Sequence, residues 1–148
     1  MRNGSFEAED VLPPLDWWLR DEPTLAAVRQ ARPDGAAGSA LTLIGSDGRG
    51  GEAAHQLLLL APGTYRLTGL AGGAQAAADW PIISLECAEG APPILHEKLS
   101  GDSKPAVRFS YDVVVPRERC AGQWLRLAID AADDNTEVWV DELSVAQR

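Results

Sequence analysis

The segment "PGTYRLTGLAGG", residues 62–73, contains a turn followed by a clear strand pattern. The Pro-Gly pair at its start is typical of a tight turn. Over residues 64–70 the side chains alternate, with Tyr65 and Leu67 on one face and Arg66 on the other. Alternation with a period of two is the pattern of a half-buried strand. The segment therefore predicts a strand that packs on a core after a chain reversal.

The same alternation recurs along the chain. In "AVRFSYDVVVP", residues 106–116, Phe109 and Val113 share a face, and in "QWLRLAID" Leu125 and Leu127 face the core while Trp124 points away. "EVWVDELSV" is apolar on both faces, so its middle is expected to be buried on both sides or bulged. Strands are expected at residues 4–9, 15–20, 25–31, 39–45, 54–61, 64–71, 81–87, 94–98, 106–115, 123–129 and 136–146. Many short strands separated by turns predict an all-β fold, a sandwich or a barrel.

Length and composition restrict the class of protein. The chain has 148 residues, of which 45% are hydrophobic, and its formal net charge is −9. We expect a single domain over residues 1–148. The acidic balance argues against nucleic acid as a partner, because a phosphate backbone requires a basic face. No apolar run is long enough to insert into a membrane. The first residues do not form a signal peptide, and we interpret the chain as a module of a longer exported bacterial protein, periplasmic or extracellular.

Two cysteines, Cys87 and Cys120, lie near strand ends. Their spacing excludes a C-x-x-C metal or redox motif. A disulfide between neighbouring strands is geometrically plausible and would indicate an oxidising compartment. Two buried free thiols are the alternative.

No catalytic motif is present. The two histidines are His55, in an apolar strand and expected to be structural, and His96, expected on the surface. The motifs H-E-x-x-H, G-x-S-x-G and the phosphate loop are all absent. We therefore expect no enzymatic activity, with a small hydrolase built on a carboxylate pair as the least favoured hypothesis.

The chain is rich in tryptophan, with five residues of this type. Trp17 and Trp18 are adjacent and must point to opposite faces of a strand, so only one can fill the core. Trp124 lies beside Arg126 on the face opposite the core leucines, where an exposed ring could stack on a sugar. Its alternative place is beneath a loop or on the core side of the second sheet. Trp139 is expected in the core. The candidate sugar contacts are Trp124, Arg126, Trp18, Trp17, Arg66 and Arg108, with Trp80 as a further candidate in a loop.

Several motifs in order carry a family resemblance. "NGSFEAE", then "LDWWLR", "GSALTL", "HQLLLLAPGTYRLTGLAGG" and finally "VWVDELSVAQ" resemble the carbohydrate-binding-module jelly rolls of the galactose-binding-like superfamily, over nearly the whole chain. The resemblance implies a jelly-roll β-sandwich of two antiparallel sheets. "SLEC…ERCAGQWLRL" also resembles ancillary jelly-roll domains of bacterial exported proteins, in which a cysteine pair ties the corresponding strands.

The resemblance also implies a structural calcium ion. In the family the ion is held between the acid of the first "FE" and the first acid of the final pair, here Glu7 and Asp141. The second acid departs from the pattern, because it is Glu142. A hydrogen-bonded carboxylate pair is the alternative. "DAADDNTE", residues 130–137, resembles a calcium loop in composition only and predicts an Asp/Asn turn.

The sequence thus predicts a non-catalytic carbohydrate-binding accessory module. Its partner would be a polysaccharide or an oligosaccharide. The alternative is a protein-interaction or assembly domain that docks to other domains of its parent protein.

Overall fold

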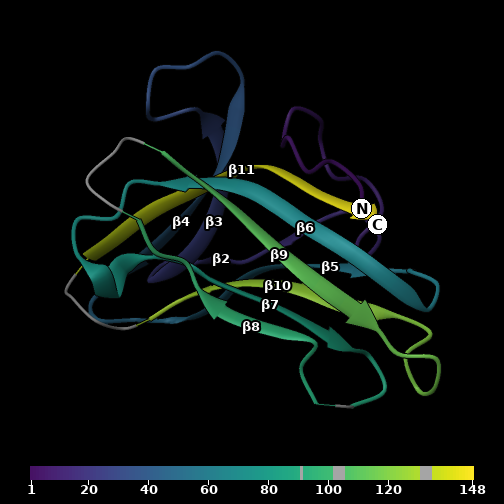
Figure 1. Cartoon of the computed structure of the whole chain (residues 1–148). Helices are drawn as coiled ribbons and strands as arrows, with labels where there is room; N and C mark the ends of the chain where they lie inside the picture. Colours follow the sequence, from purple (N-terminus) through teal and green to yellow (C-terminus); the bar gives the residue numbers. More distant parts are fainter. Residues whose placement is uncertain (91, 102–105, 131–134) are drawn as a thin grey trace.

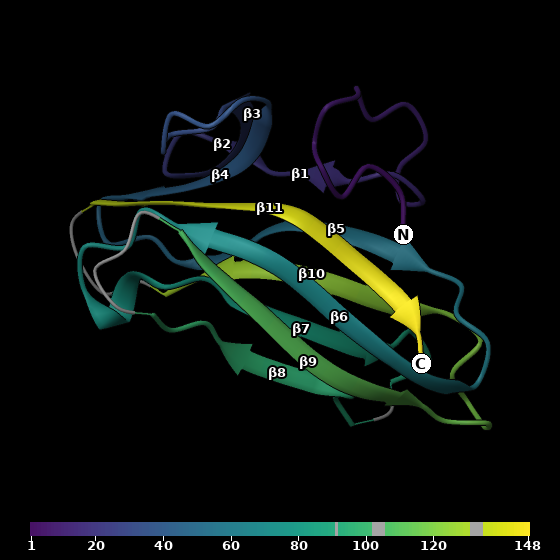
Figure 2. The ribbon, with the colours of Figure 1, turned by 45° about the horizontal axis from the view of Figure 1, so that its top comes forward.

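The computed structural model describes residues 1–90, 92–101, 106–130 and 135–148. Its strands form two antiparallel sheets that pack face to face, a jelly-roll β-sandwich as predicted (Figures 1 and 2). The five-stranded sheet has the order β1 (Trp18–Leu19), β5 (Gly51–Leu58), β10 (Gln123–Ile129), β7 (Ile82–Cys87) and β8 (Leu95–Lys98). The six-stranded sheet has the order β2 (Asp21–Glu22), β3 (Leu25–Ala31), β4 (Ser39–Ser46), β11 (Asn135–Gln147), β6 (Gly63–Gly72) and β9 (Val107–Val115). The 3₁₀ turn η1 (Ala77–Asp79) precedes β7.

The core lies between the inner faces of the two sheets. Strand alternation places the expected residues there, because successive side chains of a strand point to opposite faces. Buried core residues include Leu41, Leu43, Leu67, Ile83, Leu85, Leu125, Leu127, Val138 and Val140. Tyr65 and Phe109 are also buried, as the alternation predicts. The middle of the last strand, residues 138–141, is buried on both faces, and its pairing with β6 shifts between Asp141 and Ser144, as expected of a buried and bulged strand.

The expected first strand, at residues 4–9, is wrong: this segment is a loop with bends. Phe6 has a φ of 55°. The side chain of Asn3 donates a hydrogen bond to the Ala8 carbonyl and accepts one from the Ala8 N–H. The Phe6 ring is nonetheless buried and packs against Trp17, with ring centroids 5.5 Å apart. The apparent strand pattern in this segment therefore comes from a single buried side chain, Phe6, in a loop.

The N-terminus is attached to the five-stranded sheet by Gln56, which is fully buried. Its side-chain carbonyl accepts the Arg2 N–H at 3.0 Å, and its amide donates to the Arg2 carbonyl at 2.8 Å. The Gly4 carbonyl accepts the N–H of Leu143 in the last strand. These bonds hold the first residues near the C-terminus, and both ends lie close together in Figure 1.

The predicted disulfide joins Cys87 to Cys120, with the Cα atoms 4.8 Å apart. It connects the end of β7 to the turn before β10, and both residues are buried. The "DAADDNTE" turn falls largely on residues 131–134, outside the described residues. Among the described residues, no helix is long and apolar enough to cross a membrane.

Candidate functional site

The outer face of the five-stranded sheet carries a row of side chains from all five strands. Trp18 of β1 pairs with His55 of β5, which pairs with Arg126 of β10. Arg126 pairs in turn with Ser84 of β7, and Ser84 with His96 of β8. Adjacent strands lie about 4.8 Å apart, so the row crosses roughly 19 Å of the sheet. Two of the six predicted sugar contacts, Trp18 and Arg126, lie in this row, and a further one, Trp124, occupies the next outward position of β10.

Three aromatic rings of this face contact one another. Trp18 and His55 stack with ring centroids 4.7 Å apart and an interplanar angle of 14°. His55 meets Trp124 edge-on, with centroids 5.1 Å apart and an angle of 73°. Both tryptophans remain partly exposed. The side chains Trp18, His55 and Trp124, with the ionic groups around them, are called the aromatic face below.

Ion pairs fix the charged groups of the aromatic face. Arg126 donates from Nη1 to Glu52 and from Nε to Glu86, both at 2.6 Å, and its guanidinium carbon lies 5.4 Å from the centre of the Trp124 ring. Glu52 also contacts Nδ1 of His55. Arg20 lies over Trp18 at 5.2 Å. Cations over indole rings are attracted by the ring electrons, so these contacts hold the tryptophans in place.

Burial and hydrogen bonding shift the pKa values of this network. Burial alone would raise the pKa of Glu52, but the hydrogen bonds from His55 and Arg126 outweigh it and lower the pKa below the ordinary value. Burial lowers the pKa of Arg126, but the bonds to Glu86 and Glu52 outweigh that effect and raise it. Glu52 and Arg126 therefore both carry their charges at neutral pH.

The structure does not bring all the predicted sugar contacts together. Trp17 is buried in the core, 1% exposed, on the side opposite Trp18. Arg66 and Arg108 lie on β6 and β9, on the outer face of the six-stranded sheet, where they pair with Asp112 and Glu142. Alternation along a strand shows that such residues point outward, but sheet membership is set by long-range pairing. These two arginines are therefore separated from Trp124 by the whole sandwich.

The two remaining tryptophans are both buried. Trp80, expected in a loop, is 5% exposed and belongs to the core. Trp139 is 2% exposed, as expected, but it packs with Ala40 and Leu70 in a small separate cluster rather than in the main core. Arg32 lies over its ring at 5.2 Å. Trp18 and Trp124 are thus the two tryptophans that reach solvent.

Sequence reasoning missed four residues of the aromatic face. His55 was expected to be structural, and Arg20, Glu52 and Glu86 were not singled out. The alternation in "AAHQLLLL" does place His55 opposite the buried Gln56 and Leu58. Its contact with two tryptophans depends on the cross-strand register, which no local pattern reveals.

The calcium site implied by the resemblance stays a prediction, and the residues present fit it poorly. Oε1 of Glu7 accepts the N–H of Ser39 at 2.6 Å, and Oδ1 of Asp141 accepts the N–H of Glu142 at 2.7 Å. Oδ2 of Asp141 lies 3.4 Å from Nη1 of Arg32. In the described part of the chain, no group of three or more His, Cys, Asp or Glu residues is placed to hold a metal ion. Calcium takes six to eight oxygen ligands, and these carboxylates already serve other donors.

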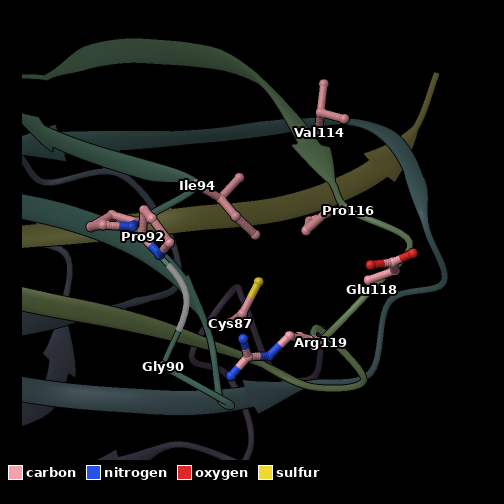
Figure 3. Close-up of a pocket in the computed structure, with 9 residues that line it drawn as sticks. Cys87, Gly90, Pro92, Ile94, Val114, Pro116, Glu118 and Arg119 are labelled. Carbon is pink, nitrogen blue, oxygen red and sulfur yellow. The ribbon is translucent and has the colours of Figure 1, made fainter.

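Two hollows lie at the end of the sandwich near the disulfide. The larger has a volume of about 580 Å³, and Figure 3 shows Pro92 and Ile94 on one side of it and Pro116, Glu118 and Arg119 on the other. The smaller, of about 420 Å³, is lined in part by residues 59–62 and 119–121. Neither includes a residue of the aromatic face. They form a second surface feature, distinct from the aromatic cluster.

Comparison with known proteins identifies the fold. No protein-family model matches the sequence, and no curated protein does. Among solved structures, a family 61 carbohydrate-binding module in complex with β-1,4-galactotriose matches with a TM-score of 0.65 and 15% identity, covering 100% of this chain and 97% of that one. A family 4 carbohydrate-binding module matches with a TM-score of 0.63 and 14% identity, covering 99% of both chains. An apo cyclase from Fischerella sp. matches with a TM-score of 0.67 and 15% identity, covering 100% and 94%. The chain therefore has the jelly-roll fold that carbohydrate-binding modules and these cyclases share.

Proposed function

We propose that this chain is a carbohydrate-binding module that binds a glycan across the aromatic face. The observation that carries the proposal is the clustering of Trp18, His55 and Trp124 on one outer sheet face. Sugar rings present apolar C–H surfaces that stack on indole rings, while their hydroxyls bond to neighbouring polar groups. The row of side chains spans the sheet and would follow an extended chain of several sugar units.

The charges of the aromatic face favour a neutral glycan. Arg126 is already paired with Glu52 and Glu86, and Arg20 pairs with Glu22 at 2.8 Å. An acidic polysaccharide would have to displace these carboxylates and approach a chain with a net charge of −9. A neutral chain can instead accept hydrogen bonds from the arginines and donate to the carboxylates without breaking the pairs. We therefore propose an uncharged hexose or pentose polymer as the ligand class.

The same network argues for binding rather than catalysis. A general acid for glycoside hydrolysis has a raised pKa, whereas that of Glu52 is lowered. Glu86 shares its arginine partner with Glu52. A pair of carboxylates bridged by one guanidinium supports orientation of hydroxyl groups. The cyclases share the fold at 15% identity, and this likeness carries no argument for their chemistry.

A glycan array followed by titration calorimetry tests the proposal. The wild type is expected to bind one class of neutral β- or α-linked polymer, with dissociation constants weaker for shorter oligomers because fewer sugars contact the row. The Trp18→Ala variant is expected to lose binding to the glycans that the wild type retains on the array. An array on which the folded wild type retains no neutral glycan would refute the proposal.

Arg66→Ala and Arg108→Ala are expected to leave the glycan dissociation constant unchanged within about twofold. Both side chains lie on the other sheet in exposed ion pairs, and exposed pairs contribute little to a distant site. Titration calorimetry with the polymer found on the array measures this. If either variant weakened binding tenfold, the ligand would lie on the six-stranded sheet and not on the aromatic face.

Glycan binding and stability are both expected to fall in acid. The folded pKa of Glu52 is lowered, so its pairs contribute fully above the ordinary glutamate range and are lost as the pH falls below that range. Protonated Glu52 no longer pairs with Arg126, which then keeps only Glu86 to hold it over the Trp124 ring. Titrations at about pH 7, 5 and 3.5 check this, with Glu52→Gln as the comparison. A Glu52→Gln variant as tight-binding and as acid-sensitive as the wild type would contradict it.

An alternative function is protein docking at the hollow beside the disulfide. Apolar Pro92, Ile94 and Pro116 line it, together with the exposed Val114. The disulfide is compatible with an extracellular site, and we propose that the domain works outside the cytoplasm beside other domains of its parent protein. This alternative would be favoured if the wild type bound no glycan and if Ile94→Asp weakened the contact between this domain and the rest of its parent protein.

A further inference from the structure

The loop between β3 and β4 is held in a fixed shape. The N–H of Arg32 donates to the Gly38 carbonyl at 3.1 Å, and the N–H of Gly35 donates to the Arg32 carbonyl at 3.2 Å. Oδ1 of Asp34 accepts the N–H of Ala36 and Nε of Arg32, at 3.2 and 3.1 Å. Contacts within its own loop therefore fix the position of Arg32.

From this position, the Arg32 side chain reaches the last strand. Its Nη1 lies 3.4 Å from Oδ2 of Asp141 and 3.5 Å from Oε1 of Glu142, and its Nη2 lies 2.7 Å from Oδ2 of Asp34. Its guanidinium carbon lies over the Trp139 ring at 5.2 Å. Only 10% of the side chain is exposed. A guanidinium offers five donors in one plane, so it can contact three carboxylates while it lies over an indole.

Glu7 closes the same junction from the N-terminal segment. Its carboxylate accepts the N–H of Ser39, the first residue of β4. It also lies against Gly38, which has a φ of +94° and where an added Cβ would stand 2.6 Å from Oε1 of Glu7. The resemblance assigns Glu7 and Asp141 to calcium. In the structure, Glu7 accepts the N–H of Ser39 at one end of the loop, and Asp141 lies against Arg32 at the other.

We propose that the Arg32 guanidinium is the structural cation of this junction, in the role that the resemblance gives to calcium. It joins the β3–β4 loop to the last strand and neutralises carboxylates from both, of which Asp141 is buried. The hydrogen bond from Arg32 lowers the pKa of Asp34, whereas burial, which outweighs the charge of Arg32, raises the pKa of Asp141. Asp34, at 2.7 Å, is the nearest partner of the guanidinium, and Asp141 and Glu142 lie 3.4 and 3.5 Å from it. The stability of the fold then requires no metal ion.

The test compares melting temperatures in chelator and in calcium for three proteins. The wild type is expected to melt at the same temperature in EDTA and in calcium chloride, and to show no heat of calcium binding by calorimetry. Arg32→Gln is expected to lower the melting temperature by about 5–10 °C, because it leaves the buried Asp141 without its cation partner. Arg66→Gln, the matched control in an exposed pair on the same sheet, is expected to change it by less than about 2 °C.

Two results would overturn the proposal. One is a wild type that loses stability in EDTA and recovers it in calcium, since a metal ion would then hold the junction. The other is an Arg32→Gln variant that melts no lower than Arg66→Gln. If Arg32→Gln does not fold, the wild-type measurements decide alone: calcium binding contradicts the proposal, and its absence supports it.

Discussion

Trp124→Ala is expected to weaken glycan binding by about 30- to 150-fold, a loss of about 2–3 kcal/mol. The side chain lies on β10, the central strand of the five-stranded sheet, and touches both His55 and Arg126. Its removal takes away the stacking surface and also releases the two groups that border it. Since the ring is on the outer face, the core residues Leu125 and Leu127 keep their packing. Calorimetric titration with the neutral glycan measures the loss, and circular dichroism verifies the fold.

Trp124→Phe is the matched control, because it keeps an aromatic ring of smaller area at the same position. It is expected to retain most of the affinity, with a loss of about three- to tenfold. Leu59→Ala is a second control, since that exposed residue lies outside the aromatic face. Equal affinities of Trp124→Ala and the wild type would show that stacking on this ring does not contribute to binding.

Reduction of the Cys87–Cys120 disulfide is expected to lower the free energy of unfolding by about 3–4 kcal/mol. The bond closes a loop with a sequence separation of 33, and cross-linking a loop of this length removes that much entropy from the unfolded chain. The melting temperature would fall by roughly 10–15 °C. Urea unfolding with and without a strong reductant, applied after unfolding to expose the buried bond, provides the measurement.

The double variant Cys87→Ala/Cys120→Ala is the control for the disulfide. It is expected to match the reduced wild type and to be insensitive to reductant. Both cysteines are buried and neither belongs to the aromatic face, so we expect the glycan affinity of the folded variant to be retained. A double variant as stable as the oxidised wild type would show that the loop is already constrained in the unfolded chain.

The local sequence pattern determined which side chains of a strand point into the core and which point outward. The alternation in β10 placed Leu125 inside and Trp124 outside, because a strand has a period of two whatever sheet it joins. The same argument separated Trp17 from Trp18 correctly. Where it failed, at residues 4–9, side-chain bonds from Asn3 gave the backbone an alternative to a strand.

Tertiary structure alone decided which outward faces coincide. Arg66 and Arg126 have the same local pattern, yet β6 and β10 belong to opposite sheets, so only one of them lies beside Trp124. His55 reaches two tryptophans only through its register with β1 and β10. Arg32, which no motif marks, lies on Trp139 because the β3–β4 loop folds against the last strand. Side-chain direction follows from the chemistry of one strand, whereas sheet membership and register follow from pairing between distant segments, which the periodicity of a single segment does not contain.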